Sequence, residues 1–332
     1  MKVRYTPLLA AALLFGAASA PLHAQGDAAP PAPPGGGVLD RPIPPTPTDA
    51  LLRYKFTAGQ VLRFNNVSDV NMTITIPGQP KPIPLSQHIE GVMRQTVQSV
   101  DPVNNTATLT VKIESIAMTM NGQPMSQSDM QKAQAAADTT LVLSELGKVI
   151  SAKLNSPSST YGFDPKQMGM YQQNGVFPIR AVKPGDTWTS TIAMSGVGAN
   201  ITSNFQLTQL TPSVGGAIAL IKQTGGGVIN SKTATAMPSG VKLNGKITMS
   251  GEVQFDVAAG QVKSQSVAAQ FDATVNTPAA PQPMGKTVAL KKKAPAANPK
   301  APTATMSSKI HMDMTSTMTR LEGDTPATPG AM

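Results

Sequence analysis

The residues with the most distinctive chemistry in this chain are its methionines, which number 18 and often stand two positions apart. Thioether sulfur suits Cu(I), and His311, Met312 and Met314 form the strongest candidate cluster. On a strand, however, Met312 and Met314 share one face, whereas His311 points to the other. Methionine is also a flexible filler of apolar cores, and only 4% of the chain is aromatic. We therefore predict that methionines line a core or a pliable apolar cavity, and we predict no metal site.

Nucleophilic catalysis needs a Ser or Cys with a base within reach. Outside the N-terminal region, His88 and His311 are the only histidines, and the chain has no cysteine. Each histidine lies in a strand-like segment without a flanking catalytic signature, and no Gly-x-Ser-x-Gly turn is present. We predict that both are surface or structurally paired histidines.

Paired carboxylates could hydrolyse glycosidic bonds, but a sugar-binding cleft needs more aromatic residues than this chain has. Gly225, Gly226 and Gly227 stand between strand-like segments and not before a helix, which predicts a bend and no phosphate loop. We therefore predict no catalytic or cofactor-binding residue, and a protein that is not an enzyme. The carboxylates considered are scattered over predicted strands: Glu90, Glu114, Glu145 and Glu252.

The elements that hold these residues are predicted to be long strands. Apolar residues alternate with polar ones from Val70 to Ile76, which is typical of a strand with one buried face. A strand near 109–120 changes register, which indicates a β-bulge at Glu114 and Ser115. Residues 126–137 favour a helix capped by Ser126 or Ser128, and a second short helix is predicted near 167–172. Further strands are predicted near residues 87–100, 139–154, 186–195, 200–211, 216–223, 243–256, 261–276 and 306–321.

A weak internal repeat relates the two halves. Gly59 precedes a strand that starts at Leu62, and Gly185 precedes one that starts at Trp188. Gly147 and Gly260 mark comparable hairpin turns. These landmarks suggest two halves of similar plan, although similar turn chemistry could also arise by chance. We predict an all-β, antiparallel fold of strongly curved sheets, half-barrel or barrel-like, with two similar halves and one or two short helices.

The first 24 residues have the pattern of a bacterial secretory signal peptide. Lys2 and Arg4 precede an apolar run from Leu8 to Ala20, and Ala24 provides the small residue before a cut at Gln25. We expect an exported protein in the periplasm or outside the cell. No Cys follows the cut, so we expect no lipid anchor. The predicted organisation is a signal peptide (1–24), a disordered Pro/Ala/Gly linker (25–50), a first β half (51–178), a second β half (179–322) with a disordered basic loop (277–305), and a disordered tail (323–332).

Without Lys2 and Arg4 of the leader, the formal net charge of +9 falls to +7, and most of this excess comes from six lysines between Gly285 and Ile310, a stretch without Asp or Glu. Lys291, Lys292 and Lys293 lie there with no acidic neighbour, among Pro and Ala residues. These lysines could attract an anionic envelope component, or they could simply keep the loop solvated. No aromatic residues alternate with them, so we expect no nucleic acid partner.

The segment containing Pro178, Val182, Gly185, Asp186 and Trp188 resembles a motif of a family of uncharacterised exported bacterial proteins, described as a domain of unknown function. The resemblance covers about residues 50–322 and implies export and β structure, but no active site. From its residue type, we expect Trp188 to anchor a core at the start of a strand. Three other parts of the chain share the resemblance: Leu52–Leu62, Gly147–Val149, and Asp256 with Gly260.

Two functions are consistent with these features. The first is a non-catalytic envelope protein that binds a lipid or another hydrophobic ligand in the concave face of a curved sheet. The alternative is a structural or interaction protein that docks on the cell envelope, or on a protein partner, through its basic Pro/Ala/Lys loop.

Overall fold

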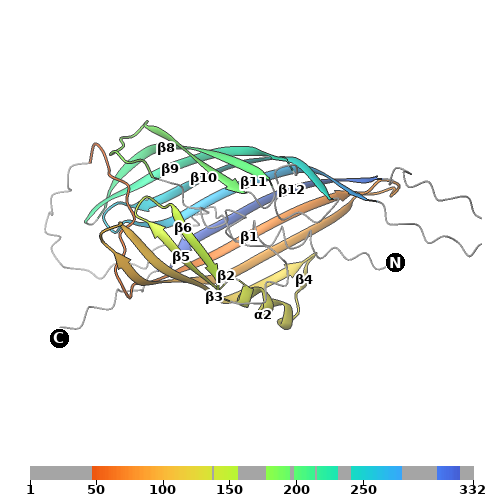
Figure 1. Cartoon of the computed structure of the whole chain (residues 1–332), viewed down its shortest axis with the longest axis horizontal. Helices are drawn as coiled ribbons and strands as arrows, with labels where there is room; N and C mark the ends of the chain where they lie inside the picture. The colour runs from red at the N-terminus through yellow and green to blue at the C-terminus, as the bar shows by residue number, and fades with distance from the viewer. Residues whose placement is uncertain are drawn as a thin grey trace, which may run out of the picture.

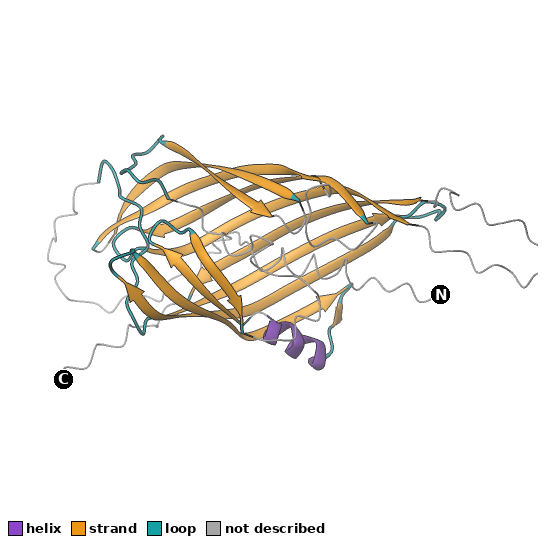
Figure 2. Ribbon diagram, in the orientation of Figure 1, coloured by secondary structure: helices purple, strands orange, loops and turns teal. Residues whose placement is uncertain are grey.

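The computed structural model describes residues 47–136, 138–155, 177–194, 198–213, 215–230, 241–278 and 305–321. These residues form one antiparallel sheet with a single short helix beside it (Figure 2). Among the described residues, no helix is long and apolar enough to cross a membrane. The strands are β1 (Val61–Thr75), β2 (Ile83–Asp101), β3 (Thr106–Met120), β4 (Gln123–Pro124), β5 (Thr139–Ser144), β6 (Val149–Leu154), β7 (Thr187–Met194), β8 (Ala199–Ser213), β9 (Gly216–Asn230), β10 (Lys242–Asp256), β11 (Gln261–Pro278) and β12 (Thr305–Arg320).

The strand order is an up-and-down circuit that stays open at one place. The sheet runs β6-β5-β3-β2-β1-β12-β11-β10-β9-β8-β7, with the short β4 added to β3. Most strands that follow one another in the chain are neighbours in the sheet, and the first long strand, β1, pairs with the last, β12. The two free edges are β6 and β7, and the sheet curves strongly between them (Figure 1). The predicted all-β, antiparallel, strongly curved architecture is confirmed.

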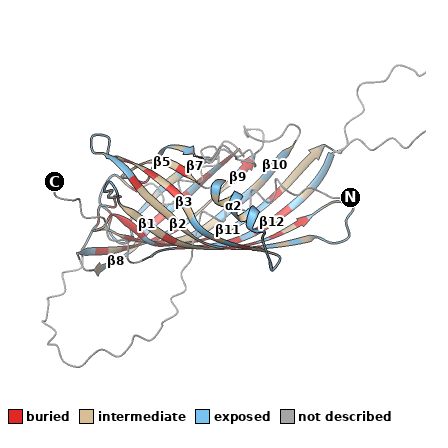
Figure 3. Cartoon of the chain, turned by 90° about the horizontal axis from the view of Figure 1, so that it is seen from below, coloured by how far each residue is buried: buried red, intermediate tan, exposed pale blue. Residues whose placement is uncertain are grey.

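Side-chain alternation gives the sheet an apolar inner face and a polar outer face. In β1, Val70, Met72 and Ile74 are buried, while Asn71 and Thr75 between and beyond them are exposed. The same alternation runs through the strands that pair with β1, so that inward residues form continuous rows across the sheet. Figure 3 shows buried and exposed positions alternating along the strands.

The bulge predicted in the third strand is present. Val92 of β2 lies opposite Ser115, and Met93 lies opposite Ile113, so Glu114 is the extra residue of β3. Gly91 lies beside this bulge, where an added Cβ would come within 2.6 Å of the Ser115 carbonyl oxygen. Glycine is needed here because the backbones approach too closely for a side chain.

The bend predicted at the three consecutive glycines is wrong. Gly225, Gly226 and Gly227 lie inside β9, and paired residues of β8 and β10 flank all three. A Cβ on Gly225 would lie 2.6 Å from the carbonyl oxygen of Thr202, and one on Gly226 would lie 2.6 Å from that of Ile247. The glycines allow neighbouring strands to approach closely without ending the strand.

The predicted helix is α2 (Gln127–Ala136). The Ser126 hydroxyl accepts a hydrogen bond from the Asp129 amide at 3.2 Å, which confirms Ser126 as the N-cap. The Gln134 side chain donates to the carbonyl oxygens of Ile113 and Glu114, at 2.7 and 3.0 Å. The helix thus contacts β3 at the bulge. The short helix predicted at 167–172 lies outside the described residues.

Hydrogen bonds at equivalent places support the internal repeat. Before β1, the Gly59 amide donates to the Val97 carbonyl of β2, and the Val97 amide donates to the Gln60 carbonyl. Before β7, the Gly185 amide donates to the Leu207 carbonyl of β8, and the Leu207 amide donates to the Asp186 carbonyl. A register shift follows Val97 in the β2–β3 pair and Leu207 in the β8–β9 pair. The two turns therefore share backbone geometry as well as composition.

Residues 50–56, which we call the strap, close one end of the sheet. Ala50, the last residue of the expected linker, forms an antiparallel bridge with Val182, just before β7. Further along the strap, the Tyr54 amide donates to the Glu145 carbonyl in the β5–β6 turn, at 2.8 Å. The Lys55 amide donates to the Gly260 carbonyl in the β10–β11 turn, at 3.1 Å. The strap thus connects both halves of the chain.

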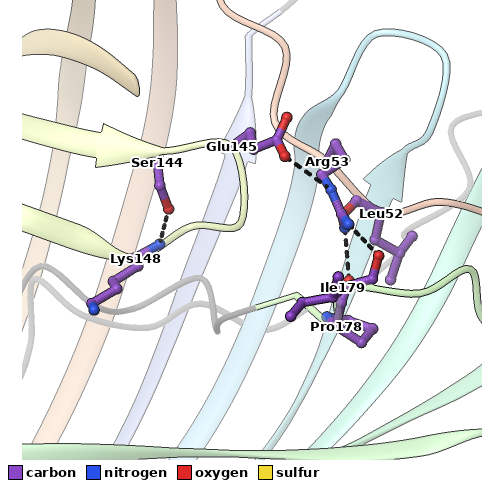
Figure 4. A network of polar contacts seen from close by, with 7 residues as sticks. All are labelled: Leu52, Arg53, Ser144, Glu145, Lys148, Pro178 and Ile179. Atoms are coloured by element: carbon purple, nitrogen blue, oxygen red, sulfur yellow. Dashed lines mark hydrogen bonds and ion pairs between the residues drawn. The ribbon is translucent and has the colours of Figure 1, made fainter. Parts of the chain in front are cut away.

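Arg53 fastens the strap (Figure 4). Its Nε lies 3.3 Å from Glu145 Oε1, and its Nη1 donates to the carbonyl oxygens of Leu52 and Pro178, each at 2.7 Å. Its Nη2 donates to the Ile179 carbonyl. Only 13% of the Arg53 side chain is exposed, so these contacts are largely shielded from water.

Candidate ligand-binding face

The described sheet carries two large apolar clusters and a small third one formed by Val97, Ala107 and Leu109. The first lies at the strap end, where the rings of Tyr54, Phe177 and Phe255 pack with centroids 4.7 to 5.6 Å apart. Trp188 stacks on Phe205 at 5.6 Å and packs against this cluster, which confirms it as a core residue. Strap residues fill this end, so it offers the protein's own core and not a binding surface.

The second cluster occupies the opposite end, and we call it the inner apolar face. Unlike the first cluster, it has no member from the strap; Ile76 of the β1–β2 turn packs against it from outside the strands. All of its buried members lie on strands: Val70, Met72, Ile74, Ala199, Ile201, Ile229, Ile247, Phe271, Ala273, Ile310, Met312 and Met314. These side chains are 2 to 9% exposed, and no strap residue packs against them.

Methionines line the inner apolar face, as the sequence predicted for a core or an apolar cavity. Met312 and Met314 are 5% and 4% exposed, and Met72 lies opposite Met312 in the register. His311 lies between the two buried methionines in sequence but on the other side of the sheet, as predicted. Among the described residues, no group of three or more His, Cys, Asp or Glu could hold a metal ion. Met168 and Met170 lie outside the described residues.

Buried polar side chains separate the two apolar clusters, and we call them the polar band. Its members are Ser68, Gln87, Ser203, Gln223 and Ser316. The Gln223 Nε2 donates to Ser203 Oγ at 3.1 Å, and the Ser203 hydroxyl lies 3.8 Å from Met249 Sδ. Gln87 Nε2 lies 3.1 Å from Met118 Sδ. The polar band gives an otherwise apolar interior a small number of hydrogen-bonding groups.

No charge reaches the described inner side around the polar band. The inward positions are the alternate residues of the ranges 66–74, 310–318, 265–273, 245–253, 221–229 and 199–207. They carry only Asn, Ser, Gln, Gly and apolar side chains. Such a surface favours uncharged, largely apolar molecules, because burying an unpaired charge is costly.

The outer face holds the histidines. His88 Nδ1 lies 2.8 Å from Asp69 Oδ1 on the neighbouring strand. His311 Nδ1 lies 2.6 Å from Asp272 Oδ1, and its Nε2 lies 3.1 Å from Asp313 Oδ2. The hydrogen bond to Asp272 raises the pKa of His311, with a smaller contribution from the charge of Asp313. Both histidines are cross-strand partners, as predicted.

The four glutamates are not brought together as a catalytic pair. Glu114 pairs with Arg63 at 2.9 Å and with Arg94 at 3.6 Å, and Glu145 pairs with Arg53. Glu90 on β2 and Glu252 on β10 are separated by three strands of the sheet. Lys291, Lys292 and Lys293 lie outside the described residues.

Gln223 and Ser203 did not emerge from the sequence analysis. The sequence predicts a strand that ends at residue 223 and a bend at the glycines that follow, which gives Gln223 no inward position within a strand. Extending the strand through the glycines places Gln223 inward, between Ile221 and Gly225. The missed signal was an amide at an inward position of an alternating strand.

Comparison with known proteins finds similarity only to solved structures, and at low sequence identity. No family model matches the chain, and no curated protein matches it. A solved structure described as lipid–protein interactions in lipovitellin is similar at 11% identity and a TM-score of 0.45, covering 83% of this chain and 27% of that chain. Salmonella typhi OmpF in complex with daunomycin follows at 6% identity and a TM-score of 0.22, covering 80% of this chain and 99% of that chain. The chain thus spans about a quarter of the lipovitellin chain, and the sheet order and register given above define the fold.

Proposed function

We propose that this protein is an exported, non-catalytic protein that binds a hydrophobic ligand against its inner apolar face. The observation that supports this most is the difference between the two ends of the sheet. Strap residues pack on the first cluster, whereas no strap residue packs on the inner apolar face, whose described members lie on the strands and, with Ile76, in the β1–β2 turn. An apolar sheet face is stable when it is covered, and an apolar ligand supplies such cover.

The methionines of the inner apolar face support a role in binding. Met72, Met312 and Met314 place flexible thioethers side by side on β1 and β12. Such side chains adapt to ligands of different shape.

Two adjacent alanines of β11 provide a matched test. Ala269 faces inward and packs against the inner apolar face, opposite Met249 and Met314. Ala268 is exposed on the outer face. We expect Ala269→Trp to remain folded and to lose binding of the apolar dye Nile red by about tenfold or more, because the indole would occupy the ligand's space. Ala268→Trp should bind the dye as the parent chain does.

Other results would contradict the proposal. If Ala269→Trp unfolds while Ala268→Trp stays folded, the face is already filled by protein. If both variants bind Nile red as the parent does, the dye binds elsewhere. Circular dichroism and dye fluorescence separate these outcomes.

The proposed export rests on the leader pattern of residues 1–24. We expect protein purified from the host's envelope fraction to begin at Gln25, as read by N-terminal sequencing. A chain that begins at Met1 in the cytosolic fraction would refute this part of the proposal.

A further inference from the structure

The polar band contains an unsatisfied hydrogen-bonding group. Gln223 is 5% exposed, and its Nε2 donates to Ser203 Oγ at 3.1 Å. Its Oε1 is buried and has no hydrogen-bond partner. A buried carboxamide oxygen without a partner is costly, and such groups in native proteins are commonly completed by water or a ligand.

Gln223 lies between Phe205, its register partner on β8, and glycines on its other sides. On β10 its register partner is Gly251, and the next inward residue of β9 is Gly225. Neither contributes a side chain. Beyond Gly225 the inner apolar face begins, with Ile229 on the same strand and Ile201 on β8. A molecule that contacts Gln223 can therefore extend along the apolar face in one direction.

We propose that the ligand is a neutral, hydroxyl-bearing amphiphile whose hydroxyl hydrogen-bonds the Gln223 carboxamide while its hydrocarbon part lies along the inner apolar face. This inference rests on the proposed function and specifies the class of its ligand. A hydroxyl donates to Oε1, and it can equally accept from Nε2 if the carboxamide rotates by a half-turn. A carboxylate or ammonium head group would find no opposite charge at the inward positions of the six strand segments given above, where its burial would be costly.

A second unsatisfied atom lies in the same row. Trp188 of β7 pairs with Phe205 of β8, which pairs with Gln223 of β9. The Trp188 Nε1 is buried without a hydrogen-bond partner. Trp188 packs against the strap-end cluster, so its Nε1 belongs to the core beside the polar band and not to the proposed ligand site. Since Trp188 is the only tryptophan of the chain and shares a row with Gln223, its fluorescence is the probe for binding at the polar band.

The test compares three probes that differ in one group: dodecanol, dodecene and dodecanoate. Each is titrated into the delipidated chain while Trp188 fluorescence is followed. We expect dodecanol to bind about tenfold more tightly than dodecene, because dodecene cannot form the hydrogen bond to the buried Gln223 carboxamide. We expect dodecanoate to bind more weakly than dodecanol, because its carboxylate charge would be buried.

Gln223→Leu should reduce the preference for dodecanol over dodecene to less than about twofold. Gln206→Leu, on the exposed side of β8, should keep the parent's preference.

Each further outcome has a distinct meaning. If all three probes bind with similar affinity and Gln223→Leu changes nothing, the proposed ligand class is wrong while hydrophobic binding stands. If dodecanoate binds most tightly, the ligand is anionic and the inference is overturned. If none of the probes binds, hydrophobic binding itself is refuted. If Gln223→Leu fails to fold, the milder Gln223→Met takes its place in the same comparison, and an unchanged preference in that variant also overturns the inference.

Discussion

At the residue scale, the pKa of His311 on the outer face depends on its carboxylate partners. Asp272 faces it at 2.6 Å and Asp313 at 3.1 Å. Both carboxylates favour the imidazolium, so the folded-state pKa of His311 lies above its usual 6.5. The stabilising contribution is therefore complete below about pH 6.5 and is lost as the pH rises through the raised folded-state value. Because the pair is exposed, the contribution to the free energy of unfolding is small.

The His311 titration provides a direct prediction. We expect its NMR titration midpoint to lie above 6.5 in the parent chain and to fall in Asp272→Asn, since the strongest partner is then neutral. Asp101→Asn, in the β2–β3 turn, should leave the midpoint unchanged. A midpoint that is the same in the parent and in Asp272→Asn would show that the pair does not form in solution.

Another residue-scale prediction concerns the close approach at Gly91. A Cβ there would lie 2.6 Å from the Ser115 carbonyl oxygen, so the strands must separate to accept it. We expect Gly91→Ala to lower the free energy of unfolding by about 1–3 kcal/mol, as measured by urea denaturation. Glu90→Ala, at the exposed position next to it, should change stability by less than about 0.5 kcal/mol. Equal stability of the two variants would show that the bulge absorbs the side chain.

At the element scale, the strap depends on Arg53. Its guanidinium satisfies the carbonyl oxygens of Leu52 and Pro178 and pairs with Glu145. We expect Arg53→Met to destabilise the fold by about 2–4 kcal/mol, because shielded carbonyls and a carboxylate lose their partner.

Arg180→Met is the matched control for the strap. Arg180 pairs with Asp186 at 2.7 Å, but 65% of its side chain is exposed. Such a surface pair contributes less than about 1 kcal/mol. If both variants lose the same stability in thermal or urea unfolding, the Arg53 contacts would have no special role in holding the strap.

Most of the strands could be predicted from the sequence because their one-sided burial leaves a period-two pattern. That pattern fails at Gly225–Gly227, where glycines stand in for side chains inside β9, and there the prediction ended the strand too early. The sequence did not predict that the strap closes the end of the sheet, because the strap's partners are distant in sequence. The Tyr54 amide donates to the Glu145 carbonyl, and the Lys55 amide donates to the Gly260 carbonyl. Gln223 was missed with the strand that positions it. Local sequence patterns predict individual strands and helices. The contacts that close the end of the sheet and form the polar band join residues far apart in the sequence, so a local pattern does not predict them.

At the scale of the whole molecule, the two clusters predict unequal stability along the sheet. Strap residues pack on the first cluster, whereas no strap residue packs on the inner apolar face, where we propose that a ligand binds. We expect amides of the delipidated chain to exchange hydrogen faster at Ala199–Ile201 and Val228–Asn230 than at Phe205–Leu207. Ligand should slow exchange in the first two segments and leave the third unchanged, as measured by mass spectrometry. Uniform exchange, unaffected by ligand, would mean that the face is covered by the chain itself.

The central claim is that the inner apolar face holds a hydrophobic molecule, and native mass spectrometry of the chain purified from its own host tests it most directly. The account predicts a stoichiometric adduct that organic solvent removes and that the Ala269→Trp chain lacks. The extracted molecule should be a neutral lipid with a hydroxyl group. A bare-chain mass under gentle conditions, with nothing recovered in the solvent, would contradict the account.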